Sequence, residues 1–124
     1  MAFVEIDKQD QIMIIKLNRP ERLNALSKVI REGMANAFIE YRDDKNLEVA
    51  ILTGEGRGFC AGEDMKESLE VGSLASAPGK GEEIENPFMN GTLDKPVIGA
   101  INGYAMGGGF MLVEKTDLRV AVKE

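Results

Sequence analysis

Hydrophobic and polar residues alternate in short runs along the first third of the chain and predict two strands followed by a helix. Residues 2–7 alternate between apolar and polar side chains, which is typical of a half-buried strand. After a polar turn at residues 8–11, the apolar run at residues 12–17 predicts a more deeply buried strand. A helix is predicted for residues 27–42, because Ser27 is a suitable N-cap and an apolar stripe follows it. The stripe consists of Ile30, Met34, Phe38 and Tyr41.

Three further apolar runs predict strands in the rest of the chain. Residues 47–53 and 96–101 are short, apolar and bounded by glycine or proline, which favours buried parallel strands. Residues 118–122 predict a last strand, and the residues around 43–46 form a polar connection. Strands that alternate with helices in this way predict an α/β architecture with crossover connections.

The second half also contains weaker helical signals. Residues 107–115 predict a helix that opens on three glycines, and residues 65–70 predict a helical turn. Residues 71–91 are rich in glycine, serine and proline and are expected to be mobile. At the end of that stretch, Asn86 is followed by proline, so residues 86–93 predict a short helix.

Size and charge exclude several classes of protein. The 124 residues suffice for one small domain, and 44% hydrophobic with 29% charged residues is ordinary for a globular protein. The formal net charge of −6 argues against nucleic-acid binding, which requires a basic surface. We also expect no membrane association, because no apolar run approaches the ~20 residues of a transmembrane helix.

The cysteine and histidine content limits the available chemistry. Cys60 is the only cysteine, so no internal disulfide is possible and a reducing, cytoplasmic location is expected. The chain has no histidine, which excludes Ser-His-Asp and Cys-His catalysis and most zinc sites. Without histidine to lower its pKa, the Cys60 thiol is interpreted as a small packed residue. No metal site is predicted.

Two glycine-rich loops carry the candidate chemistry. Residues 57–66 and 95–109 both place glycines after a buried strand and before a helix, where ligands bind in open α/β sheets. Glycine lets a ligand approach backbone N–H groups, and the first amides of a helix have no partner within the helix. One amide from each loop would form an oxyanion hole. The alternative is that the glycines only allow close packing of helix and strand; neither loop matches a dinucleotide fingerprint or a Walker A motif.

Taken together, the segments LNRPERLNALS, VAILTGEGRGFCAGEDMKE, KPVIGAINGYAMGGGF and DLRVAV resemble the crotonase (enoyl-CoA hydratase/isomerase) superfamily over essentially the whole chain. The resemblance implies an α/β fold of the ClpP/crotonase type, a spiral of ββα units, here truncated. We expect residues 1–124 to form the N-terminal part of such a domain, without the C-terminal half and the helices that form the trimer. The family's homotrimer or hexamer depends mostly on that missing part, so the sequence leaves the oligomeric state open.

The resemblance also implies which residues form the site. The thioester oxygen would accept hydrogen bonds from the amides of Glu63 and Gly108, provided that the Glu63 carboxylate points to water. The alternative for Arg22 is a solvated charge in a turn. The residues expected to line the CoA channel are Arg22, Asn24, Ala25, Ala61, Gly62, Asp64, Met65 and Lys66.

Acid–base catalysis is where the chain departs from the family pattern. Met111 stands where hydratases of the family have a catalytic glutamate, and the second such glutamate would lie beyond residue 124. Glu114, three residues after Met111, is a candidate acid, although a solvated acid on the helix surface is the favoured interpretation. Asp117 is expected to enter the last strand, Tyr104 resembles a packing tyrosine of the family, and Asp64 is a candidate cap. The methionines, including Met65, Met89, Met106 and Met111, suit either core positions or an adaptable acyl pocket.

These observations predict an acyl-CoA-binding protein, with an enoyl-CoA hydratase/isomerase that stabilises a thioester enolate as the favoured interpretation. The alternatives are another crotonase reaction, namely thioester hydrolysis, dehalogenation or decarboxylation, or a non-catalytic fragment or interaction module. No cofactor is expected, since coenzyme A enters as part of the substrate. Residues 1–124 alone are expected to show no turnover.

Overall fold

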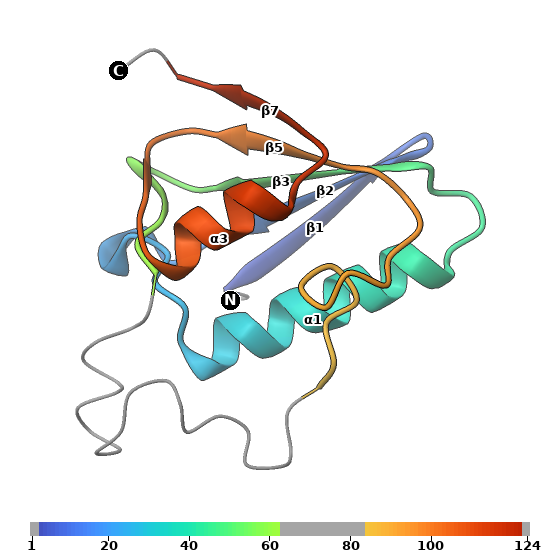
Figure 1. Ribbon diagram of the computed structural model, residues 1–124, viewed down its shortest axis with the longest axis horizontal. Helices are drawn as coiled ribbons and strands as arrows, with labels where there is room; N and C mark the ends of the chain where they lie inside the picture. The colour runs from blue at the N-terminus through green and yellow to red at the C-terminus, as the bar shows by residue number, and fades with distance from the viewer. Residues whose placement is uncertain (1–2, 63–83, 123–124) are drawn as a thin grey trace.

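A computed structural model describes residues 3–62 and 84–122, which form a five-stranded sheet, a two-stranded sheet and two α-helices (Figure 1). The larger sheet has the order β1-β2-β3-β5-β7; β1 and β2 pair antiparallel, and the other pairs are parallel. The smaller sheet pairs β4 with β6 in parallel. The strands are β1 Val4–Gln9, β2 Ile12–Leu17, β3 Val49–Gly54, β4 Gly58–Cys60, β5 Val97–Ile101, β6 Tyr104–Ala105 and β7 Leu118–Ala121. The helices are the 3-10 turn η1 Pro20–Arg22, α1 Lys28–Asp43 and α3 Gly108–Lys115.

The long helix and its neighbouring strand form as the sequence predicts. β2 has the predicted bounds, and α1 begins after Ser27, whose Oγ accepts a hydrogen bond from the amide of Ile30 at 3.3 Å. All four residues of the predicted apolar stripe are buried. At the other end of α1, Lys95 Nζ donates to the carbonyls of Tyr41 and Asp44, both at 2.8 Å. A cation at this position stabilises the C-terminal end of the helix.

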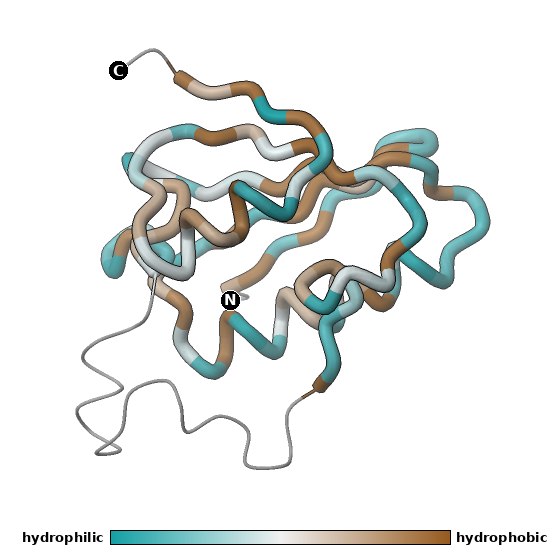
Figure 2. Tube along the Cα trace, viewed as in Figure 1, coloured by the Kyte–Doolittle hydropathy of each residue, from teal (hydrophilic) through white to brown (hydrophobic). Residues whose placement is uncertain are grey.

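The sheet buries one face more deeply than the other. Alternate residues of the central strands are buried against the helices, while those between them keep partial exposure. The predicted parallel strands at residues 47–53 and 96–101 are therefore confirmed, although each is deeply buried on one face only. Figure 2 shows hydrophobic positions along the strands, and hydrophilic ones at the β1–β2 turn and after α1. The core side chains of these strands are Met13, Ile15, Leu17, Ala50, Leu52, Val97 and Ile101.

The two edges of the larger sheet are both exposed. Five of the six residues of β1 are exposed, so the predicted half-buried strand is wrong. β1 lies at the edge of the sheet, with β2 as its neighbouring strand, so no further strand of the sheet covers its outer side. All four residues of β7 are exposed, with Leu118 at 66% and Val120 at 68%.

A ββα unit recurs along the chain. β1, β2 and α1 form the first unit, and β5, β6 and α3 form another. Between them β3 and β4 begin a unit whose continuation at residues 63–83 lies outside the described residues. The predicted turn at residues 65–70 and most of the predicted mobile segment also lie there. Among the described residues, no helix has both the length and the apolar composition needed to cross a membrane.

Residues 86–93 form a turn rather than the predicted helix. Asn86 does act as a cap, because its Oδ1 accepts hydrogen bonds from the amides of Phe88 and Met89, at 2.9 and 3.3 Å. The turn ends at Gly91, which has a φ of 79° that interrupts any helix. Phe88 is anchored on α1, where its ring stacks on that of Phe38 with centroids 4.5 Å apart. Packing on α1 therefore defines this segment.

Candidate functional site

The site lies where the parallel strands end. The register of β2, β3 and β5 places their carboxyl ends at the same edge of the sheet, so the loops that follow them gather there (Figure 1). These loops comprise residues 18–26, 55–62 and 102–107. They include residues 57–62 of the first glycine loop and residues 102–107 of the second.

The two glycine loops meet at Gly62 and Gly108. Gly62 has a φ of 94°, which favours glycine. A Cβ at this position would lie 2.6 Å from the carbonyl oxygen of Met106 and 3.1 Å from the amide nitrogen of Gly108. The backbone of Gly62 is therefore packed directly against the turn that opens α3. This convergence is what an oxyanion hole built from both loops requires.

The first amide of α3 has no internal partner. Gly107 precedes the helix with a φ of 51° and supplies no side-chain cap. The amides of Gly109 and Met111 donate to Met106 and Gly107 at 2.7 and 3.1 Å, whereas the amide of Gly108 donates to no residue within the described part of the chain. An unpartnered N–H at a helix N-terminus lies at the positive end of the helix dipole and favours a negatively charged oxygen.

The second predicted donor lies next to this point in the chain. Glu63 follows Gly62 directly, but its amide and carboxylate are outside the described residues, as are Asp64, Met65 and Lys66. Their predicted roles stay predictions. The structure does describe Gly62, the residue before Glu63, and its backbone is held by the loop at residues 18–26.

The loop at residues 18–26 holds the strand that leads to Gly62. The amide of Ala61 donates to the carbonyl of Leu23 at 2.9 Å, and the amide of Leu26 donates to the carbonyl of Gly62 at 2.6 Å. On the other side, Gly109 packs so closely on the carbonyl of Cys60 that no Cβ fits between them. Backbone contacts thus define the position of Gly62 from both sides.

Three predicted CoA-channel residues lie in this loop. Arg22 is partly buried at the end of η1, and Ala25 and Asn24 are buried. The side chain of Asn24 has 0% exposure and bonds only to backbone groups of the protein. Because the whole residue is buried, Asn24 acts here as an internal support of the loop. Asn102 also donates to backbone carbonyls of the protein, and neither asparagine was predicted from the sequence to have this internal role.

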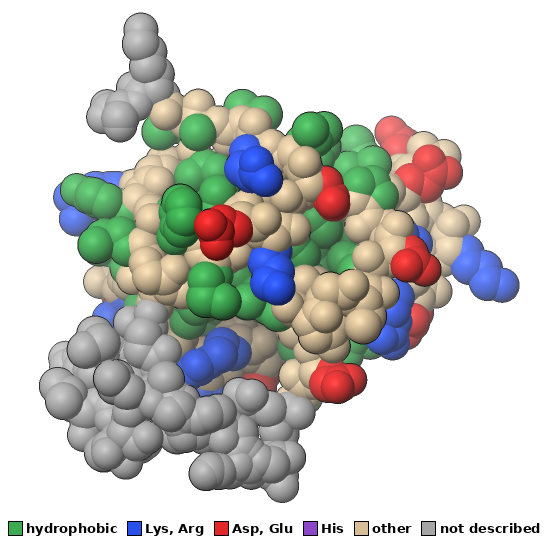
Figure 3. All heavy atoms as spheres, in the orientation of Figure 1, with side chains coloured by type: hydrophobic (Ala, Val, Ile, Leu, Met, Phe, Trp, Pro, Cys, Tyr) green, Lys and Arg blue, Asp and Glu red, His purple; other side chains and the backbone are tan. Residues whose placement is uncertain are grey.

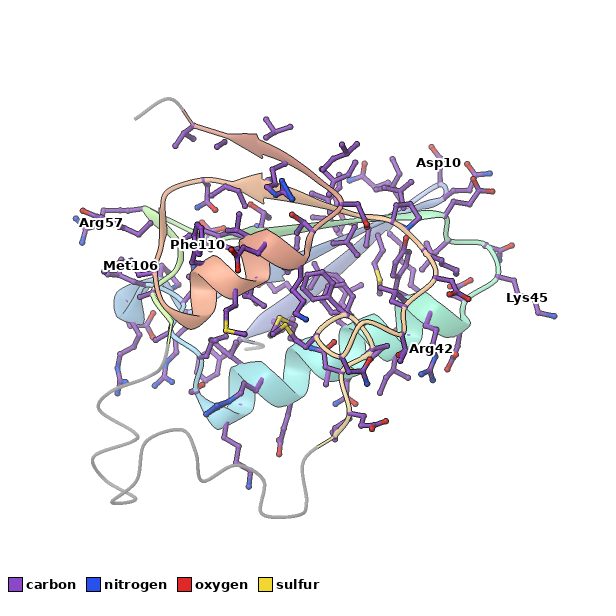
Figure 4. The ribbon with its side chains drawn as sticks, in the orientation of Figure 1. Asp10, Arg42, Lys45, Arg57, Met106 and Phe110 are labelled. Atoms are coloured by element: carbon purple, nitrogen blue, oxygen red, sulfur yellow. The ribbon has the colours of Figure 1, made fainter. Side chains whose placement is uncertain are left out.

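Apolar side chains surround the start of α3. Met106, Phe110 and Met111 are 59%, 52% and 49% exposed. Figure 4 shows Met106 and Phe110 near the N-terminal end of α3, and Figure 3 shows hydrophobic side chains among charged ones on the face that contains this helix. For Met106 and Met111 the core interpretation is wrong, and the alternative of an acyl-lining position stays open. Met89 does pack against the core.

The remaining candidates have structural or solvated positions. Tyr104 is 56% exposed, so the predicted packing role is wrong for this side chain within the described residues. Glu114 is exposed on α3, as the favoured interpretation predicted. Cys60 is fully buried, and burial raises the pKa of its thiol from 9.0 to about 11, which confirms a packed rather than a nucleophilic residue. Asp117 enters β7 as predicted, where its carboxylate accepts a hydrogen bond from the amide of Val97 at 2.8 Å.

The comparison with known proteins decides the family. The profile described as enoyl-CoA hydratase/isomerase matches residues 7–124. The chain belongs to this family. Its members among solved structures include an enoyl-CoA hydratase from Mycobacterium tuberculosis, which superposes with a TM-score of 0.82 at 36% sequence identity over 98% of this chain. The predicted crotonase fold, present in part, is thereby confirmed.

Curated relatives of this enoyl-CoA hydratase/isomerase family chain include enzymes with different names. A probable peroxisomal enoyl-CoA hydratase 1 from Arabidopsis thaliana is 38% identical over 112 residues, which are 89% of this chain and 40% of the plant protein. The 1,2-epoxyphenylacetyl-CoA isomerase of Escherichia coli is 35% identical over 128 residues, covering 99% of this chain and 48% of that enzyme. The chain thus spans less than half the length of these relatives, and it covers 46% of the M. tuberculosis structure.

Proposed function

We propose that this chain is the part of an acyl-CoA enzyme that polarises a thioester carbonyl with the backbone amides of Glu63 and Gly108. The observation that carries the proposal is the amide of Gly108, which has no partner within residues 3–62 and 84–122, lies at the start of α3 and packs against the residue that precedes Glu63. A carbonyl oxygen that accepts both amides would gain negative charge as an enolate forms. Such donors stabilise the charge without reorganisation, and loss of one typically reduces the rate by roughly 10²–10³.

The substrate is proposed to be a CoA thioester, because the names of the relatives share this chemistry and the start of α3 is apolar. Coenzyme A would be part of the substrate, and no metal or redox cofactor is proposed. We also propose a cytoplasmic location, from the single cysteine.

Enoyl-CoA hydration or isomerisation is the reaction that we favour. It needs a group that moves a proton, and Met111 has none. A carboxylate from outside the described residues would supply it, since Glu114 is an exposed surface acid. The absence of a carboxylate at Met111 leaves a second candidate open, hydrolysis of the thioester, which requires the oxyanion hole and a group that activates water but not the paired glutamates. A free CoA thiol among the products would identify hydrolysis, and a hydroxyacyl-CoA would identify hydration.

The experiment that tests the proposal removes a single hydrogen-bond donor. Gly108 is the first helical residue of α3, where proline is tolerated, so Gly108→Pro deletes the N–H with little cost to the helix. Gly108→Ala is the matched control: its Cβ meets the same flexible neighbour, Leu26 Cδ1 at 2.9 Å, but it keeps the N–H. We expect bound crotonyl-CoA labelled with ¹³C at the carbonyl to show a downfield shift with wild type and Gly108→Ala.

The same shift should be lost, or largely lost, with Gly108→Pro, because one of the two polarising donors is absent. Circular dichroism verifies that both variants are folded. An equal carbonyl shift in the proline and alanine variants would contradict the proposal, as would a carbonyl resonance that does not move when the labelled thioester binds to the wild-type chain.

A further inference from the structure

Two asparagine side chains donate hydrogen bonds to the turn between β3 and β4. Asn24 Nδ2 donates to the carbonyls of Glu55 and Gly58 at 3.0 and 2.9 Å. Asn102 Nδ2 donates to the carbonyls of Gly56 and Gly58 at 2.9 and 3.3 Å. The carbonyl of Gly58 therefore accepts a hydrogen bond from both asparagines. Asn24 follows β2 and Asn102 follows β5, so one acceptor joins two loops that are distant in the sequence.

The oxygen atoms of both side chains are also used inside the protein. Asn24 Oδ1 accepts from the amide of Arg19 at 2.7 Å, and Asn102 Oδ1 accepts from the amide of Gly54 at 3.1 Å. Thr53 Oγ1 adds a longer contact to Asn102 Oδ1 at 3.4 Å. Asn24 holds this position with a φ of 56°, a left-handed conformation that asparagine tolerates better than most residues. Each side chain thus links its own loop to the β3–β4 region.

The clamp formed by Asn24 and Asn102 connects three segments: the loop at residues 18–26, the first glycine loop through Gly58, and the second glycine loop through Asn102. Next to Asn24, the carbonyl of Leu23 and the amide of Leu26 bond to Ala61 and Gly62. The strand held in this way is β4, which begins at Gly58 and leads to Gly62.

On the side of Asn102, the chain contacts β4 again. Gly103 packs on the carbonyl of Arg57 with no room for a Cβ, and the amide of Met106 donates to the carbonyl of Cys60 at 3.2 Å. β6 pairs with β4 between these two contacts. From there the chain runs directly into Gly108, so β4 is the common support of both loops.

We propose that Asn24 and Asn102 are positioning residues that couple the two loops through the carbonyl of Gly58 and so keep Gly62 against the amide of Gly108. Neither side chain touches the reacting atoms. Their effect on a bound thioester rests on the proposed function, but the coupling itself is a property of the free protein. A merely local role would instead confine the effect of each asparagine to its own loop.

Hydrogen exchange in the free protein tests the coupling. Asn102→Asp keeps the size and the acceptor oxygen but replaces the donor to Gly58. We expect the protection of the Ala61 and Leu26 amides, whose hydrogen bonds join β4 and Gly62 to the loop containing Asn24, to fall roughly tenfold or more. The reason is that a carboxylate oxygen would replace the donor at position 102 and face the carbonyls of Gly56 and Gly58. The reciprocal variant, Asn24→Asp, should lower the protection of the Met106 amide by a similar factor.

Asn46→Asp is the matched control, because Asn46 is exposed in the loop after α1 and should change none of these amides. Amides in the middle of α1 correct for any change in global stability. Loss of protection confined to the loop that contains the substitution would overturn the proposal. Asn102 is partly exposed, so its variant decides the question even if the buried charge of Asn24→Asp unfolds the chain.

The labelled crotonyl-CoA described above adds a readout that a structural role would not move. If the two loops are coupled through Gly58, Asn102→Asp reduces the ¹³C shift of the bound thioester carbonyl. The affinity for CoA without an acyl group stays unchanged. A full wild-type shift that persists in Asn102→Asp would overturn the positioning role and leave the proposed function intact. Absence of the shift in wild type would contradict the proposed function, and hydrogen exchange would still decide whether the loops are coupled.

Discussion

The two helices of the described chain differ in how their ends and faces are used. α1 is capped by Ser27 at its N-terminus and by Lys95 at its C-terminus, and it buries six side chains. α3 begins on Gly107 without a side-chain cap, and only Gly109 and Leu112 are buried. α1 thus has its polar ends satisfied and its apolar face covered, whereas α3 leaves both an amide and apolar side chains accessible.

This difference separates stability from binding. Burial and capping contribute to the free energy of folding, so α1 carries most of the helix-derived stability. An unpartnered amide and exposed methionines contribute little to folding. A ligand could accept a hydrogen bond from this amide and cover the exposed methionine side chains. The helix that stabilises the fold least is therefore the one that the proposed function needs most.

The largest expected contrast is between the phenylalanines of the two helices. Phe38→Ala removes a fully buried ring that stacks on Phe88, and it should lower the free energy of unfolding by about 3–5 kcal/mol. Phe110→Ala removes a half-exposed ring from α3 and should change the same quantity by less than about 0.5 kcal/mol. Urea denaturation of both variants measures this. Similar losses would show that α3 contributes to the core as α1 does.

A smaller contrast is expected for a glycine in each helix. A Cβ at Gly109 would collide with the backbone carbonyl of Cys60, which cannot move without separating α3 from β4. Gly109→Ala should therefore cost roughly 1–3 kcal/mol and weaken binding of crotonyl-CoA.

The matched substitution in α1 is Gly33→Ala, whose Cβ would meet the side chain of Val4 at 2.8 Å. Val4 lies on an edge strand, and alanine favours the helix by up to about 1 kcal/mol, so we expect a change close to zero. Thermal and urea unfolding of the two variants provide the measurement. If Gly109→Ala is tolerated as well as Gly33→Ala, α3 is not seated on β4 as described.

The smallest effect is expected from pH. Burial raises the pKa of the Cys60 thiol, beneath α3, to about 11, and that of the Tyr41 phenol, on α1, to about 12. The folded state then holds each proton to higher pH than the unfolded state, so stability is complete below pH 9 and falls above it. Between pH 9 and 10 the thiol contributes first, by less than about 1.4 kcal/mol.

Urea midpoints measured under reducing conditions check this order. In Cys60→Ala, the fall in the urea midpoint between pH 9 and 10 should be smaller than in wild type, whatever the effect of the substitution at neutral pH. Tyr41→Phe should show the same fall as wild type in this range. Parallel curves for wild type and Cys60→Ala would mean that the buried thiol does not titrate in this window.

The elements that the sequence predicted well depend on local signals. α1 follows from one cap and a stripe of four apolar residues within a single segment, and β2 from six consecutive residues. The glycine loops were also identified from local composition. That the two loops lie together was anticipated because parallel strands bring their carboxyl ends to one edge, whereas the choice of Glu63 and Gly108 as donors came from the family resemblance.

What the sequence did not reveal depends on distant partners. β4 and β6 are three and two residues long, and each forms because Gly58 and Cys60 pair with Tyr104 and Ala105, which are distant in the sequence. Asn102 bonds to a carbonyl 44 residues away, and no pattern in a single segment distinguishes it from an ordinary turn residue. The dipeptide of Asn102 and Gly103 was a possible signal, although it more commonly marks a simple turn.

The two outer strands of the larger sheet have a consequence for association. β1 presents the charged side chains of Glu5, Asp7 and Lys8, which disfavour the addition of a foreign strand. β7 presents Leu118 and Val120, and its charged residue, Arg119, turns its guanidinium to the carbonyls of Val113 and Thr116. Among the strands that the structure describes, β7 therefore offers the more apolar edge for pairing with a further strand, whether that strand comes from the same protein or from another.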